Sequence, residues 1–349
     1  MDLQNEEIIS LENVHTIGVI MFGLLGDVFI RTPVLKALKE LYPEAKVFVC
    51  VDSIGALVLE NNLYCDEILV VNRSKKNRLQ YYANKISTLV KIRARKPDLM
   101  VDLYNGGSSP MNVFLSSARY RLGYAHQKDK KLYNILSQYI PYSNGQIDSY
   151  NVQIISILQA ISKKQFSIKP IYNIRDESRE FIANYFLEKN IVSKEVYVIN
   201  LGSGGEEKLL SLDIYAQLIG YIYKKYGYIP LIIQNPGQEY LQKNLVQLLE
   251  KTDVPYLALE LLTLDEIAAL IEKTLFFITP DTGLMHLAFA LDAYVLTAFT
   301  YTNPKLVDLC SENFFPVFDS FAEENIHQVQ DISFDMMREN LDRLITSLK

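Results

Sequence analysis

The residues best suited to chemistry lie in one short stretch, TPDTGLMHLAFAL, from 279 to 291. An apolar segment runs straight into Asp281, Thr282 and Gly283, where a helical pattern begins. His286 follows one turn later. A helix N-terminus carries about half a positive charge and spare N–H donors, so it can hold a phosphate. Asp281 would repel a phosphate, and we expect it to cap the helix or to accept from a sugar hydroxyl. An ordinary capped helix with a satisfied histidine fits the same pattern.

A second candidate is the stretch FGLLGDVF at 22–29, where an apolar run stops and glycines bend the chain. Asp27 stands at the exit of this loop, next to Gly26, and a carboxylate there could take a proton from a hydroxyl. Arg31 and Asn105 are expected near the same edge. Taken alone, the pattern favours a helix cap at Asp27, and the other two residues could equally be plain surface positions.

A third candidate is the glycine-rich loop GSGGEEK at 202–208, which follows an apolar run. Its residues Gly202, Ser203 and Gly204 allow the backbone to approach a ligand closely, and Lys208 can reach a phosphate. The loop is not a Walker A motif, because the lysine lacks both the preceding glycine and the following Ser or Thr. A solvated loop lysine is an even alternative.

Several chemistries are disfavoured by what the sequence lacks. The four histidines are scattered, with no H-E-x-x-H and no Cys/His cluster, so a zinc site is not expected. No G-x-S-x-G occurs, and no Asp-x-Asp pair is present to bridge a metal and a diphosphate, so we expect no metal. Gly23 and Gly26 do not complete G-x-G-x-x-G, which makes a ribose-binding role for Asp52 weak.

The composition is that of a globular protein with room for two domains: 349 residues, 49% hydrophobic and 22% charged. No apolar run approaches the ~20 residues that cross a bilayer, and the first residues lack the basic region of a signal peptide. The three cysteines have neither metal nor disulfide spacing. We therefore expect a cytoplasmic protein whose cysteines are small buried hydrophobic residues.

The charge is unevenly distributed along the chain. Between residues 70 and 131, fourteen Lys or Arg stand against three acidic residues, so this stretch carries +11 and the remainder −17 of a net −6. Such a basic region suggests an anionic acceptor or a membrane surface as partner. A solvated, lysine-rich helix face is the alternative for residues 73–96.

Strand-like apolar runs alternate with helical patterns along both halves, which is typical of parallel sheets covered on both faces. Thr32 and Pro33 look like the start of a helix, as do Asp213 and the capping box TLDE. Strands are expected at 15–22, 45–52, 66–72, 98–105, 119–125, 196–204, 228–234, 275–279 and 294–300, and helices at 32–43, after residue 73, near 110–118, from 213 to 227, at 236–251, after 263–266 and after 281.

The sequence thus predicts an α/β fold with two doubly wound, Rossmann-like domains, residues 1–172 and 173–349, joined by a linker near 167–178. Two consecutive domains of this kind are expected to face each other across a cleft at the carboxyl ends of their strands, where ligands bind in such folds. By analogy with such folds, the last helix, about 334–348, is expected to pack back on the first half.

Three stretches together resemble glycosyltransferase family 9, the lipopolysaccharide heptosyltransferases. They are GLLGDVFIRTPVLKALKELYPEAKV, DLYNGGSSPMNVFLSSARYRLGYA and TPDTGLMHLAFALDAYVLTAFTYTNP, and the last is the most specific. The resemblance runs from about His15 to Asp308.

This resemblance implies the GT-B fold and an inverting, metal-independent transfer of a heptose from a nucleotide-diphosphate sugar, with no other cofactor. By position, Asp27 matches the family's general base and Lys208 the lysine that steadies the leaving diphosphate. The implied donor-binding residues are Gly202, Ser203, Gly204, Glu239, Asp281, Thr282, Gly283 and His286, and the implied acceptor-side residues are Gly26, Arg31 and Asn105. Glu239 is a looser match, and an ordinary first-turn helix acid fits it as well.

The resemblance also implies the partners: ADP-heptose or a related donor, and an anionic glycolipid or glycan acceptor reached at the inner membrane face, with no nucleic acid. The chain departs from the family pattern after Lys208, where Leu209-Leu210-Ser211 replace an aromatic–proline pair, and it has no tryptophan.

Two other functions are compatible with the same patterns. One is a nucleotide-sugar epimerase of the same fold, which would need no acceptor and which the basic first half argues against. The other is a non-catalytic relative that only binds the donor. A dehydrogenase is disfavoured because the dinucleotide fingerprint is missing.

Overall fold

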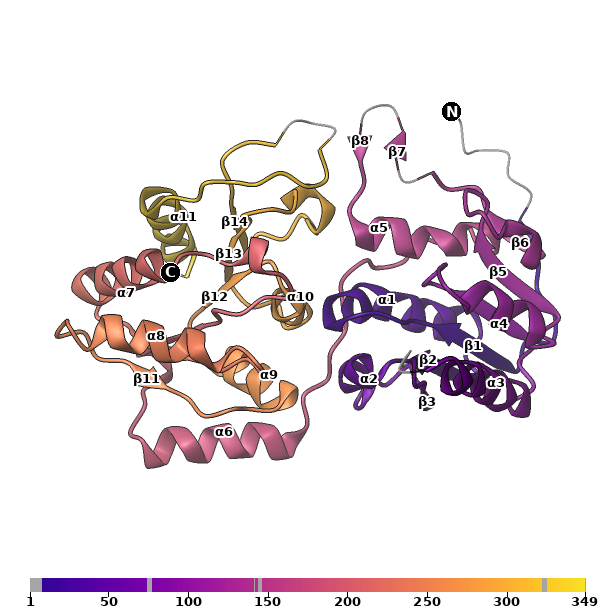
Figure 1. Cartoon of the computed structure of the whole chain (residues 1–349), viewed down its shortest axis with the longest axis horizontal. Coiled ribbons are helices and arrows are strands. Elements are labelled where there is room, and N and C mark those ends of the chain that lie inside the picture. The colour runs from indigo at the N-terminus through magenta and orange to yellow at the C-terminus, as the bar shows by residue number, and fades with distance from the viewer. Residues whose placement is uncertain (1–7, 74–76, 141, 144–145, 322–324, 349) are drawn as a thin grey trace. The chain divides into compact units, whose positions relative to one another are not determined.

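The computed structural model describes residues 8–73, 77–140, 142–143, 146–321 and 325–348. The chain divides into two compact units, Met1–Asn173 (unit 1) and Ile174–Lys349 (unit 2). This division falls inside the stretch 167–178 that the sequence suggested as a linker. Each unit is a parallel sheet with its own helices, shown in Figure 1.

Unit 1 holds a six-stranded sheet in the order β3-β2-β1-β4-β5-β6, in which every neighbouring pair is parallel. Its strands are β1 (Thr16–Ile20), β2 (Lys46–Val51), β3 (Glu67–Val70), β4 (Leu99–Asp102), β5 (Tyr120–Tyr124) and β6 (Ile135–Ser137). Its helices are α1 (Leu25–Leu41), α2 (Ser53–Leu59), α3 (Arg78–Ala94), α4 (Ser109–Leu115), η2 (Lys130–Leu132), α5 (Tyr150–Ile155) and η3 (Ser156–Ala160). A separate antiparallel pair is formed by β7 (Tyr142–Ser143) and β8 (Gln146–Ile147).

Unit 2 repeats the arrangement in the order β11-β10-β9-β12-β13-β14, again all parallel. Its strands are β9 (Val196–Ile199), β10 (Ile229–Ile232), β11 (Leu257–Ala258), β12 (Phe277–Pro280), β13 (Val295–Ala298) and β14 (Phe314–Val317). Its helices are α6 (Asp176–Glu188), η4 (Ser193–Glu195), η5 (Glu206–Lys208), α7 (Leu212–Tyr226), α8 (Glu239–Leu249), α9 (Leu264–Lys273), α10 (Gly283–Ala290), η6 (Pro304–Leu306) and α11 (Phe334–Ser347).

These two strand orders confirm the predicted α/β class, because each sheet reverses its direction of winding once. The reversal lies between β1 and β4 in unit 1 and between β9 and β12 in unit 2. Loops that leave such neighbouring strands diverge, and the crevice between them is where doubly wound sheets bind ligands. In each unit, the candidate residues therefore belong to the loops and helices that follow these two central strands, except Glu239, which follows β10.

The expected start of α1 is wrong. Thr32 and Pro33 lie inside the helix, which begins at Leu25. A proline inside a helix leaves the carbonyl four residues earlier without its usual donor. Here that carbonyl belongs to Phe29, and the buried Thr32 hydroxyl donates to it over 2.7 Å. The threonine that looked like a cap thus supplies the hydrogen bond that the proline cannot.

Other helix ends follow the sequence more closely. The capping box at Thr263 and Glu266 is present, and Gly227 ends α7 with a left-handed φ of 76°. The cap of α7 is Ser211 rather than Asp213, since the Ser211 hydroxyl accepts from the Asp213 N–H. A residue two positions earlier in the chain therefore does what the aspartate was expected to do.

Helix α11 packs on the sheet of its own unit. It contacts α7, β13 and β14, and its buried side chains Met337, Leu341, Leu344 and Ile345 belong to the core of unit 2. Its apolar stripe is taken up there, which corrects the expectation that it packs on the first half.

Two further observations bear on the composition. Cys50 is buried and Cys65 is partly buried, but Cys310 is exposed, so the description of all three as buried residues is wrong. Among the described residues, no helix combines the length and the apolar character needed to span a bilayer.

Candidate active site

In unit 2, the structure joins two of the predicted residues directly. Lys208 Nζ lies 2.6 Å from Asp281 Oδ2. Lys208 ends η5 in the loop after β9, and Asp281 follows the last residue of β12, so the pair connects the loops of the two central strands. The Asp281 side chain is only 8% exposed and that of Lys208 is 28% exposed. A lysine held this way has a fixed position and keeps two further N–H donors for a ligand.

The start of α10 differs from the expectation. Thr282 rather than Asp281 is the N-cap, because its hydroxyl accepts from the Leu284 N–H over 3.2 Å. Asp281 is engaged by Lys208 and does not cap the helix. The helix begins at Gly283, where no Cβ covers the first turn, and Asp281, which holds Lys208, lies two residues before that start. A cation and a helix N-terminus at one point attract an anion.

His286 lies inside the same helix and is buried, with 4% of its surface exposed. Its ring packs edge-on against Phe289 at a centroid distance of 5.8 Å. The structure therefore places the His286 ring on the buried side of α10.

A buried amide that the sequence reasoning missed organises these loops. Asn200 follows β9 and is fully buried. Its Nδ2 donates to Thr279 Oγ1 over 2.9 Å and to the Gly202 carbonyl over 3.1 Å, and it lies 3.5 Å from Thr282 Oγ1. Its Oδ1 accepts from the Gly202 N–H over 3.2 Å. One side chain thus connects the glycine loop with the cap of α10.

The glycine loop is fixed from a second side by the loop after β10. The Gly202 N–H donates to Asn235 Oδ1 over 3.2 Å, and Gln238 exchanges hydrogen bonds with both the N–H and the carbonyl of Ser203, over 3.1 and 3.0 Å. A Cβ on Gly202 would lie 2.5 Å from Asn235 Cγ, so a larger residue there would displace the side chains that hold the loop. Gly204, by contrast, is exposed.

Glu239 opens α8 beside this loop. Its carboxylate accepts from the Gly237 N–H over 2.9 Å, and this bond lowers the pKa of Glu239 from its ordinary value. The neighbouring Gln238, which the sequence did not single out, makes the contacts with Ser203.

The residues after Lys208 that depart from the family pattern have structural roles. Leu210 is buried in the core of unit 2, and Ser211 caps α7. The segment therefore anchors the end of the lysine loop by burial and capping.

In unit 1, Asp27 lies in the first turn of α1 and is exposed. Its Oδ2 accepts from the Leu24 N–H over 2.9 Å, so the carboxylate turns back over the loop that follows β1. Asp27 is thus the third residue of the helix and not its cap. Gly26, next to it, is part of the same first turn.

Arg31 and Asn105 line a common pocket of about 180 Å³ in unit 1, together with Tyr124 and His126. Arg31 connects the segments that follow the two central strands, since it donates to the carbonyls of Phe22 and Leu103 over 2.7 and 3.1 Å. Burial lowers the pKa of the Arg31 guanidinium from its ordinary value, while the nearby Asp27 carboxylate acts in the opposite direction.

Asn105 has a positive φ of 50°, a conformation that asparagine tolerates better than most residues. It is held there by Asp102, which is fully buried and accepts from the Asn105 N–H over 2.9 Å and from the Tyr133 hydroxyl over 2.7 Å. Burial raises the pKa of Asp102 above its ordinary value, although these hydrogen bonds oppose the shift. Asp102 was not predicted as a site residue; it fixes the loop that carries Asn105.

A second network that the sequence missed holds the loop of Asp27. Asp52, at the end of β2, accepts from the Gly23 N–H over 3.0 Å and from Arg73 Nη1 over 3.1 Å. Arg73 also donates to the Tyr104 hydroxyl over 2.8 Å and lies 4.7 Å from the ring centroids of both Phe22 and Tyr104. The sequence indicated only a weak ribose-binding role for Asp52. In the structure, Asp52 instead holds the backbone at Gly23, in the loop before Asp27.

Within the described part of the chain, His, Cys, Asp and Glu side chains nowhere gather in a group of three that could hold a metal ion.

A family model described as glycosyltransferase family 9 (heptosyltransferase) matches residues 88–330 of this chain. Lipopolysaccharide heptosyltransferase 3 of Escherichia coli is 23% identical over 284 residues, which cover 80% of this chain and 81% of that protein. A Haemophilus influenzae protein with a glycosyltransferase name is 27% identical over 225 residues, or 63% of this chain and 64% of its own length, so the match spans less than two thirds of that relative.

Solved structures show the same fold. The glycosyl transferase family 9 protein of Veillonella parvula superposes with a TM-score of 0.81 at 18% identity, covering 97% of this chain and 99% of that one. The E. coli ADP-heptose lipopolysaccharide heptosyltransferase II gives a TM-score of 0.76 at 17% identity, covering 95% and 99%. The fold is therefore GT-B, as the resemblance implied.

Proposed function

This chain belongs to glycosyltransferase family 9, and we propose that it is an inverting, metal-independent glycosyltransferase that moves a heptose, or a related sugar, from a nucleotide-diphosphate donor to a glycan acceptor. The observation that carries this proposal is the contact between Lys208 and Asp281 at the N-terminus of α10. Together with the cap at Thr282, it supplies one cation and a set of backbone amides at a single point of unit 2.

A diphosphate leaving group needs this kind of site. When the bond between the anomeric carbon and the diphosphate breaks, negative charge develops on the departing oxygen. Fixed donors aimed at that charge stabilise the transition state by about 3–4 kcal/mol per group. Asp281 keeps Lys208 in position before the donor binds, and the paired carboxylate repels a phosphate less than a lone one would.

In the proposed reaction, Asp27 is the general base. It takes the proton of the acceptor hydroxyl as the oxygen of that hydroxyl attacks the anomeric carbon on the face opposite the diphosphate. One C–O bond forms, the bond to the diphosphate breaks, and the configuration at the anomeric carbon inverts. The nucleoside diphosphate leaves with its charge next to Lys208 and the first amides of α10, while Arg31 and Asn105 line the pocket assigned to the acceptor.

The proposed donor is ADP-heptose, because the E. coli relative named above is an ADP-heptose transferase. The donor is a co-substrate, and no further cofactor is required. Gly202, Ser203 and Gly204 would approach the diphosphate through their backbone, and Glu239 would lie at the nucleoside end.

The proposed acceptor is the lipopolysaccharide core or another anionic glycan, since a curated relative is a lipopolysaccharide heptosyltransferase. The +11 charge of residues 70–131 in unit 1 supports an anionic acceptor. Transfer would then take place at the cytoplasmic face of the inner membrane.

Thermal shift followed by a transfer assay tests this function. At about 100 times its dissociation constant, the true donor should add about 2.7 kcal/mol to the free energy of unfolding, and UDP- and GDP-sugars serve as controls. NMR of the product should show the inverted anomeric configuration. Formation of an isomer from the donor alone, with no acceptor present, would instead assign the protein to the epimerases.

A further inference from the structure

Helix α3 of unit 1 exposes an apolar stripe to solvent. Tyr82, Ile86 and Val90 are 60–63% exposed. Residues four apart lie on the same face of a helix, so these three side chains form one line along α3. The opposite face of the helix already packs in the interior of unit 1, because Thr88 and Ile92 are buried. The stripe is therefore additional to what α3 needs to pack.

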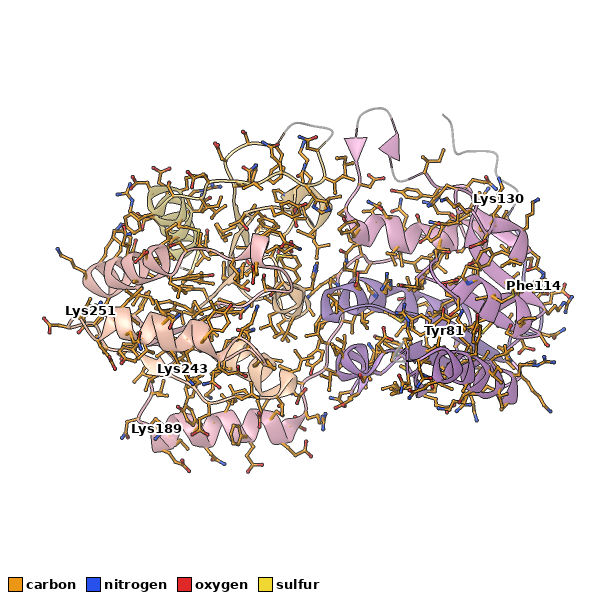
Figure 2. All side chains as sticks on the ribbon, viewed as in Figure 1. Tyr81, Phe114, Lys130, Lys189, Lys243 and Lys251 are labelled. Carbon is orange, nitrogen blue, oxygen red and sulfur yellow. The ribbon has the colours of Figure 1, made fainter. Side chains whose placement is uncertain are left out.

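The neighbouring helix α4 extends this apolar surface. Met111, Phe114 and Leu115 are 39–48% exposed. Helices α3 and α4 contact each other, and Ile92 and Val113 join one core cluster beneath them. Figure 2 labels Phe114, which lies on α4. We call the six residues Tyr82, Ile86, Val90, Met111, Phe114 and Leu115 the α3–α4 face.

The charge along the chain around this face is mainly positive. No acidic residue occurs from 73 to 96 or from 103 to 128. Two of the three acids between 70 and 131 are used internally: Asp98 accepts from the N–H groups of His15 and Thr16, and Asp102 is fully buried. Only Asp129 of the three is exposed.

The cations, in contrast, lie beside the apolar side chains. Lys91 and Arg93 are exposed on α3 itself. The Arg121 guanidinium lies 5.7 Å from the centre of the Phe114 ring. Lys130 and Lys131 belong to η2, which packs against α4. Aromatic and aliphatic groups flanked by lysine and arginine are the composition of surfaces that enter the headgroup region of a bilayer.

We propose that the α3–α4 face docks on an anionic lipid bilayer, which deepens the proposed function because the acceptor of that reaction is lipid-linked. The apolar side chains enter the boundary between headgroups and acyl chains, and the surrounding cations contact anionic headgroups. A protein partner is disfavoured by the concentration of one charge sign around the face, since protein interfaces deplete lysine. A membrane leaflet offers a continuous negative surface that matches it.

Vesicle co-sedimentation tests this surface without any sugar substrate, so its outcome is independent of transfer activity. The full chain is mixed with vesicles of phosphatidylglycerol and phosphatidylcholine, or of phosphatidylcholine alone. The test variants are Ile86→Gln with Phe114→Gln for the apolar part and Lys91→Gln with Lys130→Gln for the cations. The matched controls are Leu63→Gln with Leu187→Gln, at positions 74% and 75% exposed, and Lys189→Gln with Lys243→Gln, which Figure 2 labels in unit 2.

The unsubstituted protein should bind the anionic vesicles, and more weakly as salt rises. Each lysine removed from the face should weaken partitioning about fivefold, and loss of Ile86 and Phe114 should weaken it at least as much. Both control pairs should bind like the parent, and thermal unfolding should show that all variants are folded. Absence of binding to anionic vesicles, or equal losses in test and control pairs, would overturn the proposal. A dimer in sedimentation that Ile86→Gln dissociates, with no vesicle binding, would assign the face to a second copy of the chain.

Discussion

Lys208 and Asp281 lie 73 positions apart in the chain, yet their side chains meet at 2.6 Å where the loops of β9 and β12 come together. The contact fixes the lysine before any ligand arrives. It also explains why an aspartate precedes the helix N-terminus that we assign to the diphosphate: its charge is matched by the lysine.

Lys208→Gln should lower kcat by about 10²- to 10³-fold, because one donor to the departing diphosphate is lost. Lys208→Arg, which keeps the charge, should retain more activity. In a double-mutant cycle, Asp281→Asn should lower the transfer rate less in the Lys208→Gln background than in the unsubstituted protein. The reason is that the carboxylate then has no lysine to position. Single-turnover rates measure the effect. Strictly additive losses would show that the pair does not act as a unit.

Asp27→Asn should leave donor binding unchanged and reduce transfer by about 10²- to 10⁴-fold, because the amide cannot accept the proton of the acceptor hydroxyl. The Leu24 N–H can still donate to the asparagine oxygen, so the loop should keep its shape. Donor affinity by calorimetry and the transfer rate separate the two effects. Near-normal turnover would remove Asp27 from the role of base.

Asp52 and Arg73 should act on catalysis through the loop before Asp27. Asp52→Ala frees the Gly23 N–H and the Arg73 guanidinium, so kcat should fall about 10- to 100-fold as the base loses its fixed position. Donor affinity, a property of unit 2, should not change. Asp52→Asn, whose amide oxygen still accepts from Gly23, should restore most of the rate. A loss that appears in donor affinity instead of kcat would contradict a positioning role.

Asp342 should make the packing of α11 sensitive to acid. It accepts from Tyr226, Lys225 and Tyr221 on α7, and although burial opposes them, these bonds hold the pKa of Asp342 below its ordinary value of 3.8. A lowered carboxyl pKa stabilises the fold above the ordinary value, and this stability is lost as pH falls through the folded-state pKa.

At neutral pH, Asp342→Asn should therefore lower the free energy of unfolding by about 1 kcal/mol. The expected loss is no larger because the carboxylate is 34% exposed and solvent weakens its interactions. The corresponding fall in Tm is about 2–4 °C, and it should become smaller as the pH is lowered through and below 3.8, the ordinary pKa of the carboxyl group. Glu339→Gln, on the same helix at a position 72% exposed, is the control and should change Tm little. Equal Tm shifts at pH 7 and pH 3 would contradict the linkage.

The cysteines should differ sharply in reactivity. Burial raises the pKa of Cys50 to about 12 and that of Cys65 to about 11, whereas Cys310 is exposed. Since the thiolate is the reactive form, a thiol reagent at pH 8 should modify one cysteine quickly in the folded protein and three after denaturation. Peptide mass spectrometry should find the fast label on Cys310.

Much of the fold could be predicted because parallel strands buried on both faces have a recognisable, continuous apolar sequence. Runs such as residues 16–20 and 196–199 are continuous, apolar and bounded by turns. Strand β14 was not predicted, because Pro316 interrupts its short apolar segment. Helix starts were harder: Thr32-Pro33 has the pattern of a start, but the apolar face of α1 extends a full turn and more before it.

The candidate site, too, could be predicted only in part. The types of its residues could be recognised, but their partners could not. Asp281 and Thr282 are both good caps, and the choice between them is made by Lys208, far away in the chain. Asn200 and Asp52 look unremarkable in sequence because their roles depend on loops brought together by the sheets. Long-range contacts of this kind leave no local pattern.

The buried amide of Asn200 has a consequence for how donors are selected. Because one side chain holds both the glycine loop and the cap of α10, neither loop can shift without disturbing the other. A donor with a bulkier sugar cannot be accommodated by loosening one wall alone, so a change in sugar preference should require paired substitutions around Asn200.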